Sequence, residues 1–266
     1  MRPLSSWQVP CPIVGVFTDI DDTLTTEGAI TPDALQALAD LKSAGLHVVP
    51  ITGRPVGWSA PFAVSWPVDA IVAENGAVGL HHTAEQGLRK LYQQDNSTRS
   101  AHFARMQQVL AQIERTVPGA TRSQDSAGRE TDIAIDHSEF THLPPAAIDE
   151  VVRRMQAEGM TATVSSIHVN AWFGEHSKLT GARWIVRELW GRDLDAEIKH
   201  WVYVGDSTND QVMFAHFPHS IGVANIRRFE SQLAHRPCYI SPCERGAGFA
   251  QVVKHLLNPE NQLGSD

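Results

Sequence analysis

Two apolar runs of the sequence end in carboxylates. Asp19, Asp21 and Asp22 follow the first run, and Asp206 and Asp210 follow the second. Like charges this close repel each other, and a carboxylate beside an apolar core is costly unless something neutralises it. Magnesium prefers one or two carboxylates together with waters and a phosphate, so Asp19 and Asp206 predict a site for this cation.

The remaining polar residues complete a site for phosphoryl transfer. Thr52 offers a hydroxyl and, with Gly53, backbone N–H groups, and Lys178 offers a positive charge for the other phosphate oxygens. A cation would orient the phosphate and screen it from the attacking carboxylate. Asp19 could then act as a nucleophile that forms an aspartyl-phosphate, and Asp21 could protonate the leaving oxygen and later take a proton from water.

Strands and helices alternate where these residues must be positioned. Apolar runs at 13–18, 46–52 and 69–77 predict strands, and residues 31–45 predict a helix with Leu35, Leu38 and Leu41 on one face. This βαβ order implies a parallel sheet with right-handed crossovers. Because ligands bind at the carboxyl ends of parallel strands, the polar residues are expected to meet at one edge of the sheet.

The pattern changes in the middle of the chain. Strand candidates at 88–93, 130–137 and 161–172 alternate apolar and polar residues, as strands of an antiparallel sheet with one solvated face do. Helix candidates at 101–116 and 145–158 accompany them. The sequence therefore predicts an α/β fold in which a Rossmann-like core (1–83 and 174–266) carries an inserted α+β cap domain (84–173).

Composition excludes several classes of partner. The 266 residues carry a formal net charge of −8 and no long basic run, so nucleic acid is not an expected partner. No segment approaches the roughly 20 apolar residues of a membrane span, so neither a membrane partner nor a signal peptide is expected, and the predicted location is the cytoplasm. The three cysteines fit no zinc spacing and are expected to be reduced thiols.

Four of these segments resemble the motifs of the haloacid dehalogenase superfamily, in the order in which that family has them. They are "DIDDTLT" from Asp19, "ITGRP" from Ile51, the lone Lys178, and "GDSTND" from Gly205. The insert resembles the α+β cap of subfamily IIB, whose members often carry an "NGA" like the one that begins at Asn75. Within that subfamily, the chain is similar to Cof-type, sucrose-phosphate and mannosyl-3-phosphoglycerate phosphatases.

The resemblance implies a role for each motif residue. Asp19 would be the nucleophile and Asp21 the acid/base, and Thr52 and Lys178 would bind phosphate. Asp19, the backbone carbonyl of Asp21, and Asp206 would hold Mg²⁺, with Asp210 assisting directly or through water. Asp22 and Asp210 have a second interpretation, because acidic residues at such junctions also cap helices or bond to turns.

Further polar residues are candidates for contacts with the substrate, either because they lie near a motif or because they share a face of a cap strand: Arg54, Asn75, Arg129, His168, Asn170 and Asn209. Each has an ordinary structural alternative, such as an ion pair for Arg54 or a turn for Asn75.

The sequence thus predicts a magnesium-dependent phosphatase that hydrolyses a small phosphorylated metabolite, above all a sugar phosphate. One alternative is a phosphomannomutase-like phosphotransferase, which would need a sugar bisphosphate and would release little phosphate. Another is a non-catalytic sugar-phosphate-binding protein, which the presence of both Asp19 and Asp21 disfavours. The sequence does not fix the oligomeric state or the substrate.

Overall fold

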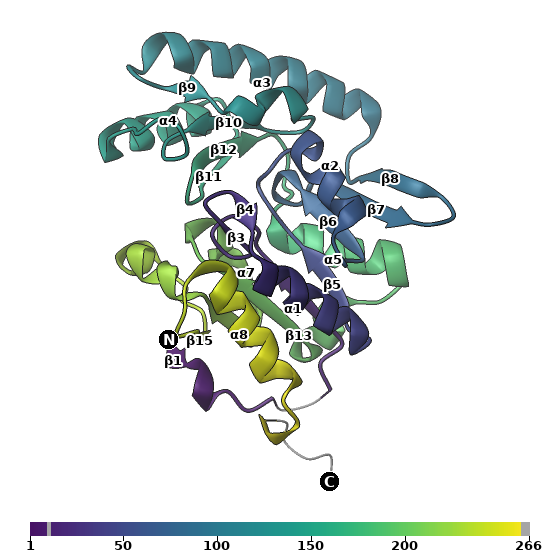
Figure 1. Ribbon diagram of the computed structural model, residues 1–266. Coiled ribbons are helices and arrows are strands. Elements are labelled where there is room, and N and C mark those ends of the chain that lie inside the picture. Colours follow the sequence, from purple (N-terminus) through teal and green to yellow (C-terminus); the bar gives the residue numbers. More distant parts are fainter. Residues whose placement is uncertain (10–11, 262–266) are drawn as a thin grey trace.

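A six-stranded parallel sheet forms the centre of the molecule in the computed structural model, which describes residues 1–9 and 12–261 (Figure 1). From one edge to the other its strands are β1 (Arg2–Pro3), β15 (Tyr239–Ile240), β14 (His219–Gly222), β13 (Trp201–Gly205), β2 (Gly15–Thr18) and β5 (His47–Pro50). All neighbouring strands run parallel. The predicted α/β core is confirmed.

A three-stranded antiparallel sheet continues this core beyond β5. Its strands are β6 (Ala70–Ala73), β7 (Val78–Thr83) and β8 (Gly87–Tyr92). A parallel bridge between Ile51 and Val72 joins β6 to the chain that follows β5. Strand β8 pairs along its length with β7, so the segment that the sequence analysis placed in the insert extends the core instead.

Helices cover both faces of the parallel sheet. One face is buried under α1 (Pro32–Ser43) and α8 (Arg245–Leu257), and α2 (Val56–Ser65) continues this layer over β6 and β7. The other is buried under α5 (Lys178–Trp190), α6 (Leu194–Glu197) and α7 (Gln211–His216). Two separate apolar clusters therefore lie on either side of the sheet, as expected for a sheet whose crossover helices pack on both faces.

Helix α1 shows how the buried face differs from the one expected. Its inward residues are Ala34, Ala37, Leu38 and Leu41, which follow the i, i+3, i+4, i+7 spacing of one helical stripe. Leu35 is 37% exposed, so it does not share the buried face of Leu38 and Leu41 as expected. The two small alanines allow the helix to lie close to the sheet. Because alanine is a weaker sign of burial than leucine, the sequence alone does not identify this stripe.

The insert forms its own antiparallel layer above the core, in teal and green in Figure 1. Its sheet has the order β11-β12-β10-β9, formed by β9 (Thr121–Arg122), β10 (Ile133–Asp136), β11 (Thr161–Val164) and β12 (His168–Trp172). Helices α3 (Asn96–Thr116) and α4 (Pro145–Ala157) complete a third apolar cluster with this sheet. Residues 161–172 form a hairpin of two strands rather than the single strand expected.

A short hairpin of the core faces the insert. Strands β3 (Thr25–Thr26) and β4 (Ala29–Ile30) follow the first aspartate motif and pair antiparallel. Among the described residues no helix is both long and apolar enough to cross a membrane. Cys238 and Cys243 are free thiols, and Cys11 lies outside the described residues.

His176 makes the stability of the fold depend on pH. It lies between β12 and α5, its ring stacks on Trp172 with 5.2 Å between centroids, and neither ring nitrogen has a hydrogen-bond partner among the described residues. Burial, assisted by the charge of His102, lowers the pKa of His176 to about 4. The unfolded chain, with an ordinary histidine pKa near 6.5, therefore binds a proton that the folded chain refuses between these two pH values.

We expect this stabilising contribution to be complete above about pH 6.5 and to be lost as the pH falls toward 4, on the order of 3 kcal/mol at most. Urea unfolding of the wild type and of His176→Phe at pH 7.5 and pH 4.5 tests this. The variant should lose less stability between the two values. Equal losses in both proteins would contradict the assignment.

Candidate active site

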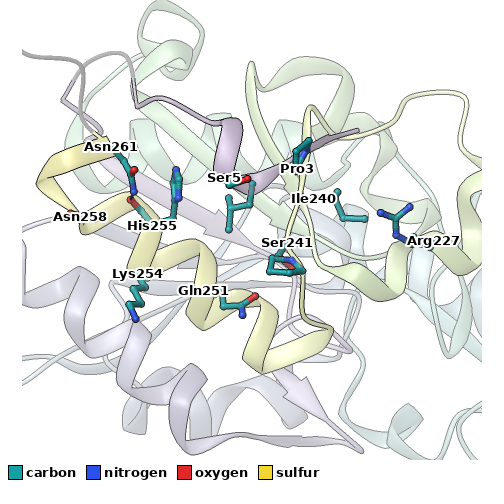
Figure 2. Close-up of a pocket in the computed structure, with 12 residues that line it drawn as sticks. Pro3, Ser5, Arg227, Ile240, Ser241, Gln251, Lys254, His255, Asn258 and Asn261 are labelled. Atoms are coloured by element: carbon teal, nitrogen blue, oxygen red, sulfur yellow. Dashed lines mark hydrogen bonds between the residues drawn. The ribbon is translucent and has the colours of Figure 1, made fainter.

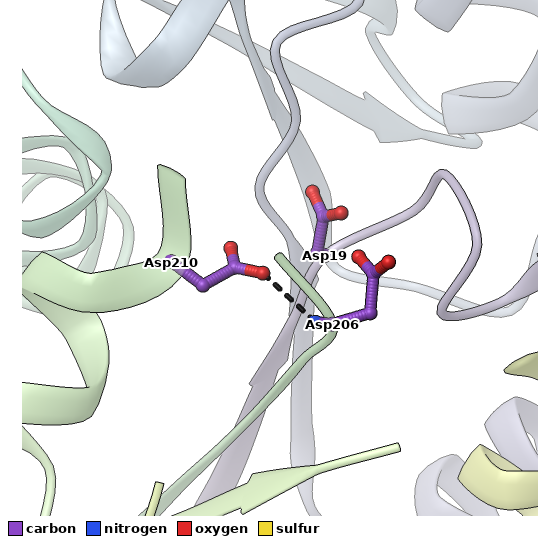
Figure 3. A group of neighbouring side chains, drawn as sticks. All are labelled: Asp19, Asp206 and Asp210. Atoms are coloured by element: carbon purple, nitrogen blue, oxygen red, sulfur yellow. Dashed lines mark hydrogen bonds between the residues drawn. The ribbon is translucent and has the colours of Figure 1, made fainter. Parts of the chain in front are cut away.

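The two aspartate motifs meet where β2 and β13 end. These strands are neighbours, and the register pairs Val204 with Thr18 one or two residues before the aspartates. Asp19 and Asp206 therefore leave adjacent strand ends, and Asp210 points toward them from the start of the following helical turn (Figure 3). One carboxylate oxygen of each of the three residues lies within 4.8 Å of the others, and all three residues are buried.

Lys178 enters this cluster from the other side of the insert. It is the first residue of α5, whose start is fixed by a capping box between Ser177 and Thr180. Its Nζ lies 2.7 Å from Asp19 Oδ1 and 2.7 Å from Asp210 Oδ1. Burial alone would lower the pKa of Lys178, but the two carboxylates raise it above its ordinary value, so the lysine is charged.

Both carboxylate oxygens of Asp210 accept hydrogen bonds that hold the site together. Its Oδ1 accepts from Lys178 and from the hydroxyl of Tyr203, and its Oδ2 accepts from the backbone N–H groups of Asp206 at 2.9 Å and Ser207 at 3.1 Å. A carboxylate offers about four such acceptor positions. Asp210 thus has little left for a cation and acts mainly on the loop and on the lysine.

Asp19 and Asp206, in contrast, keep oxygen lone pairs that are free to bind a cation. Among the described residues the side chain of Asp19 accepts a hydrogen bond only at Oδ1, and Asp206 accepts one bond at each oxygen, from Thr23 at 3.3 Å and from Asn225 at 2.9 Å. The negative charges of Asp19 and Asp206 are not fully balanced by the single ammonium group of Lys178. Burial raises the pKa of Asp19 to about 7 against the opposing effect of Lys178, and burial followed by the charges of Asp19 and Asp210 raises the pKa of Asp206 well above its ordinary value.

These residues fit a magnesium ion. Three buried carboxylates face one ammonium group, and free carboxylate oxygens on neighbouring strand ends are hard ligands that such a cation prefers. The Asp21 carboxylate is not in this cluster. Any contribution of Asp21 to the metal would come from its backbone carbonyl, as the family resemblance implies.

Asp21 instead pairs with Arg54. The Nε of Arg54 lies 3.0 Å from both oxygens of Asp21. The same guanidinium reaches the insert, where it pairs with Asp125 at 3.2 Å and Glu139 at 2.7 Å. Arg54 was a candidate for substrate contact, but its buried side chain is occupied by three carboxylates and ties the acid/base candidate to the insert.

Thr52 and Gly53 lie beside the cluster with fewer free N–H groups than expected. The Thr52 N–H donates to Val72 O at 2.9 Å, so the expectation that it is available to a phosphate is wrong. The Thr52 hydroxyl accepts from the Arg54 N–H at 3.0 Å and keeps its own proton to donate. The Gly53 N–H has no acceptor among the described residues, which leaves this hydroxyl and this amide for the phosphate.

Three candidate substrate residues converge on the other side of Gly53. Its carbonyl accepts from Arg129 at 3.0 Å and from Asn170 at 3.2 Å. Asp132 joins them, since its carboxylate accepts from Arg129 at 2.7 Å, Asn170 at 3.2 Å and Asn75 at 3.4 Å. All four side chains are buried, so this group fastens the insert to the phosphate loop.

The other two candidates for substrate contact, His168 and Asn209, also form hydrogen bonds within the protein. The Nε2 of His168 lies 2.9 Å from Glu139, which links it to Arg54. Asn209 accepts from the Ser207 hydroxyl at 2.8 Å, within the second aspartate motif. The structure brings the candidates to the junction of core and insert, and their contact with a substrate stays a prediction.

Several residues of the site were missed by the sequence analysis. Thr23 and Asn225 hold Asp206, and Tyr203 holds Asp210. Asn225 follows β14, so its place after a third strand end was a usable signal. Glu74 was also missed as an anchor: its buried carboxylate accepts from the backbone of Val56 in the core and of Glu130 and Thr131 in the insert.

Two cavities must be distinguished. One of about 600 Å³ opens beside Asp21 and Arg54, between the β3–β4 hairpin and the insert. Another of about 480 Å³ lies beside β1, β15 and α8 (Figure 2). No carboxylate lines the second cavity, and none of its lining residues belongs to the two aspartate motifs. The chemistry therefore belongs with the first.

Comparisons with known proteins agree with this geometry. The family model of haloacid dehalogenase-like hydrolases matches residues 16–127. A comparison with curated proteins finds no match.

Solved structures share the fold over most of the chain. A protein from Thermoplasma acidophilum is 17% identical with a TM-score of 0.70, and the match covers 92% of this chain and 98% of that one. The sucrose-phosphatase of Synechocystis, solved with sucrose and phosphate, is 15% identical with a TM-score of 0.65 and the same two coverages. A subclass IIB sugar phosphatase is 14% identical with a TM-score of 0.60, covering 91% and 98%.

The fold is shared with these structures along more than nine-tenths of the chain. The two motifs that contain Asp19, Asp21 and Thr52 lie inside the segment that the family model matches. Residues 16–127 are thus similar to the haloacid dehalogenase-like hydrolases, and the chain shares its fold with these solved structures.

Proposed function

We propose that this protein is a magnesium-dependent phosphatase that hydrolyses a small sugar phosphate through an aspartyl-phosphate on Asp19. The observation that carries the proposal is the position of the Lys178 ammonium, 2.7 Å from both Asp19 and Asp210 in a buried cluster with Asp206. A structural role alone would not need three buried carboxylates for one lysine, because each uncompensated charge is costly.

Each role in the proposed reaction is assigned to a residue of the chain. Asp19 Oδ2, which Lys178 leaves free, is the attacking atom, and the Thr52 hydroxyl and Gly53 N–H hold phosphate oxygens. Asp21 delivers a proton to the leaving oxygen and then takes one from the water that attacks the phosphorus. A magnesium ion held by Asp19 and Asp206 would supply charge neutralisation for the phosphate.

In this proposal the insert acts as a cap domain, and of its predicted range, 84–173, the first strand, β8, belongs to the core sheet. Its contacts with Arg54 and Gly53 exclude bulk water from the phosphate side. The sugar-phosphatase structures that share the fold support a sugar phosphate as the substrate class.

The test is phosphate release from a panel of sugar phosphates, measured with Mg²⁺ and with a chelator. We expect release from a narrow set of hexose phosphates, with at least roughly 100-fold less in the chelator. Release that a chelator does not reduce would overturn the role of the metal.

Two other outcomes identify the alternatives. Conversion of a sugar phosphate only after addition of a sugar bisphosphate, with little free phosphate, would identify a phosphomannomutase-like phosphotransferase. Binding of sugar phosphates without any turnover would identify a non-catalytic binding protein.

A further inference from the structure

The cavity beside Asp21 lies on the side of the site where a leaving group must sit. It measures about 600 Å³ and is the space between the β3–β4 hairpin of the core and a loop of the insert. The inference below rests on the proposed function, because it takes Asp21 as the residue that faces the departing oxygen. The lining residues then decide which phosphate esters can enter.

The insert presents a preformed loop to this cavity. The buried carboxylate of Asp136 accepts four backbone N–H bonds, from Ser138 and Glu139 at one oxygen and from Phe140 and Thr141 at the other, all between 2.9 and 3.1 Å. Four such bonds fix the backbone before any ligand arrives. Ser138, Glu139 and Phe140 all line the cavity, so the side chains are displayed from a rigid support.

The charges around the cavity are unfavourable for an additional anion. Four carboxylates line it, against two guanidinium groups. Arg54 is already paired with Asp21 and Glu139, and Arg245 is paired with Asp22 at 3.0 Å. Glu27, at the turn of the β3–β4 hairpin, has no hydrogen bond or ion pair among the described residues. Its exposed carboxylate lines the cavity without a paired cation among the described residues.

The cavity also has an apolar side. Phe140 is 61% exposed, the most exposed of the large hydrophobic side chains in the described chain, and it lines the cavity together with Ile167. An exposed aromatic ring at the edge of a polar cavity is typical of a ligand site. Carboxylates accept hydrogen bonds from hydroxyl groups, and a ring face packs against C–H groups, so the two together suit a sugar.

We infer that this cavity selects a polyhydroxylated leaving group that carries no second anionic group, and that Glu27, Glu139 and Phe140 determine this selection. A hexose monophosphate meets the condition. A sugar bisphosphate or a phosphoglycerate does not, because its second anion would face Glu27 and Glu139 with no free cation to balance it. The inference also opposes a mutase that needs a sugar bisphosphate.

The experiment compares kcat/KM for glucose 6-phosphate, fructose 1,6-bisphosphate and 3-phosphoglycerate, with p-nitrophenyl phosphate as a general ester. In the wild type we expect kcat/KM for the hexose monophosphate to exceed that for both competitors, which carry a second anionic group, at least tenfold. In Glu27→Lys this ratio should fall about tenfold, because one charge near the second anion changes sign. Glu85→Lys is the matched control, since Glu85 is exposed in the β7–β8 turn outside the cavity, and its ratio should equal that of the wild type.

The outcomes separate this inference from the proposed function. Hydrolysis of p-nitrophenyl phosphate with equal or better use of the bisphosphate, or an unchanged ratio in Glu27→Lys, would overturn the selection while leaving the phosphatase in place. No hydrolysis of any ester would reject the phosphatase. In that case calorimetry of glucose 6-phosphate and fructose 1,6-bisphosphate binding still decides the selection, with the monophosphate expected to bind at least tenfold more tightly.

Discussion

Replacing Asp19 by asparagine is expected to lower phosphate release by roughly 10⁴-fold or more while the fold remains intact. The change removes the attacking oxygen and a metal ligand without altering the side-chain volume. The fold should tolerate it, because the substitution removes one of three buried carboxylates whose charges repel one another. The measurements are kcat/KM for a hexose phosphate and the urea unfolding curve in the same buffer.

Asp149→Asn provides the control for this substitution. Asp149 is exposed on α4, in the insert, and makes no hydrogen bond or ion pair among the described residues. It should keep wild-type activity and stability. An Asp19→Asn protein that retains more than about a tenth of wild-type turnover would refute the covalent mechanism, whatever its stability.

Replacing Lys178 by methionine should cost both activity and stability. The variant leaves Asp19 and Asp210 buried without their shared cation, and removal of one partner from a buried pair costs about 3 kcal/mol of unfolding free energy. Loss of a charged phosphate donor should lower kcat by roughly 10²-fold to 10³-fold. Urea unfolding with and without Mg²⁺ is the decisive measurement, because added cation should recover more stability in the variant than in the wild type.

Two control variants of the same protein are needed to interpret this result. Lys178→Arg keeps the charge and should lose less stability than Lys178→Met. Lys254→Met removes an exposed lysine of α8 and should unfold like the wild type. If Mg²⁺ stabilises Lys178→Met no more than the wild type, the cation does not bind near this lysine.

The core of the fold was predictable because local and global signals agree there. An apolar run that ends abruptly in carboxylates has few uses other than a buried strand with a polar end, and β2 and β13 both follow that pattern. Helix α5 carries a capping box at its start and Gly191 in a left-handed conformation at its end. The meeting of Asp19, Lys178 and Asp206 then followed from the parallel order of the strands.

Other features could not be read from the chain. Strand β15 has only two residues, Tyr239 and Ile240, and its existence depends on the edge offered by β14. Residues 161–172 alternate as one strand would, and only the pairing of β12 with β10 decides that they fold back as a hairpin. The division of labour between Asp206 and Asp210 depends on donors such as Tyr203 and Asn225, which are distant in sequence or carry no motif.

The support that Asp136 gives to the loop at residues 138–141 has a consequence for how this protein can change over evolutionary time. The loop backbone is held from behind, by one buried carboxylate, rather than by the side chains that face the ligand. Ser138 and Phe140 can therefore be exchanged without loss of the loop's shape. The acquisition of a new substrate becomes a matter of a few surface mutations, and the strand ends that perform the reaction need not adapt at all.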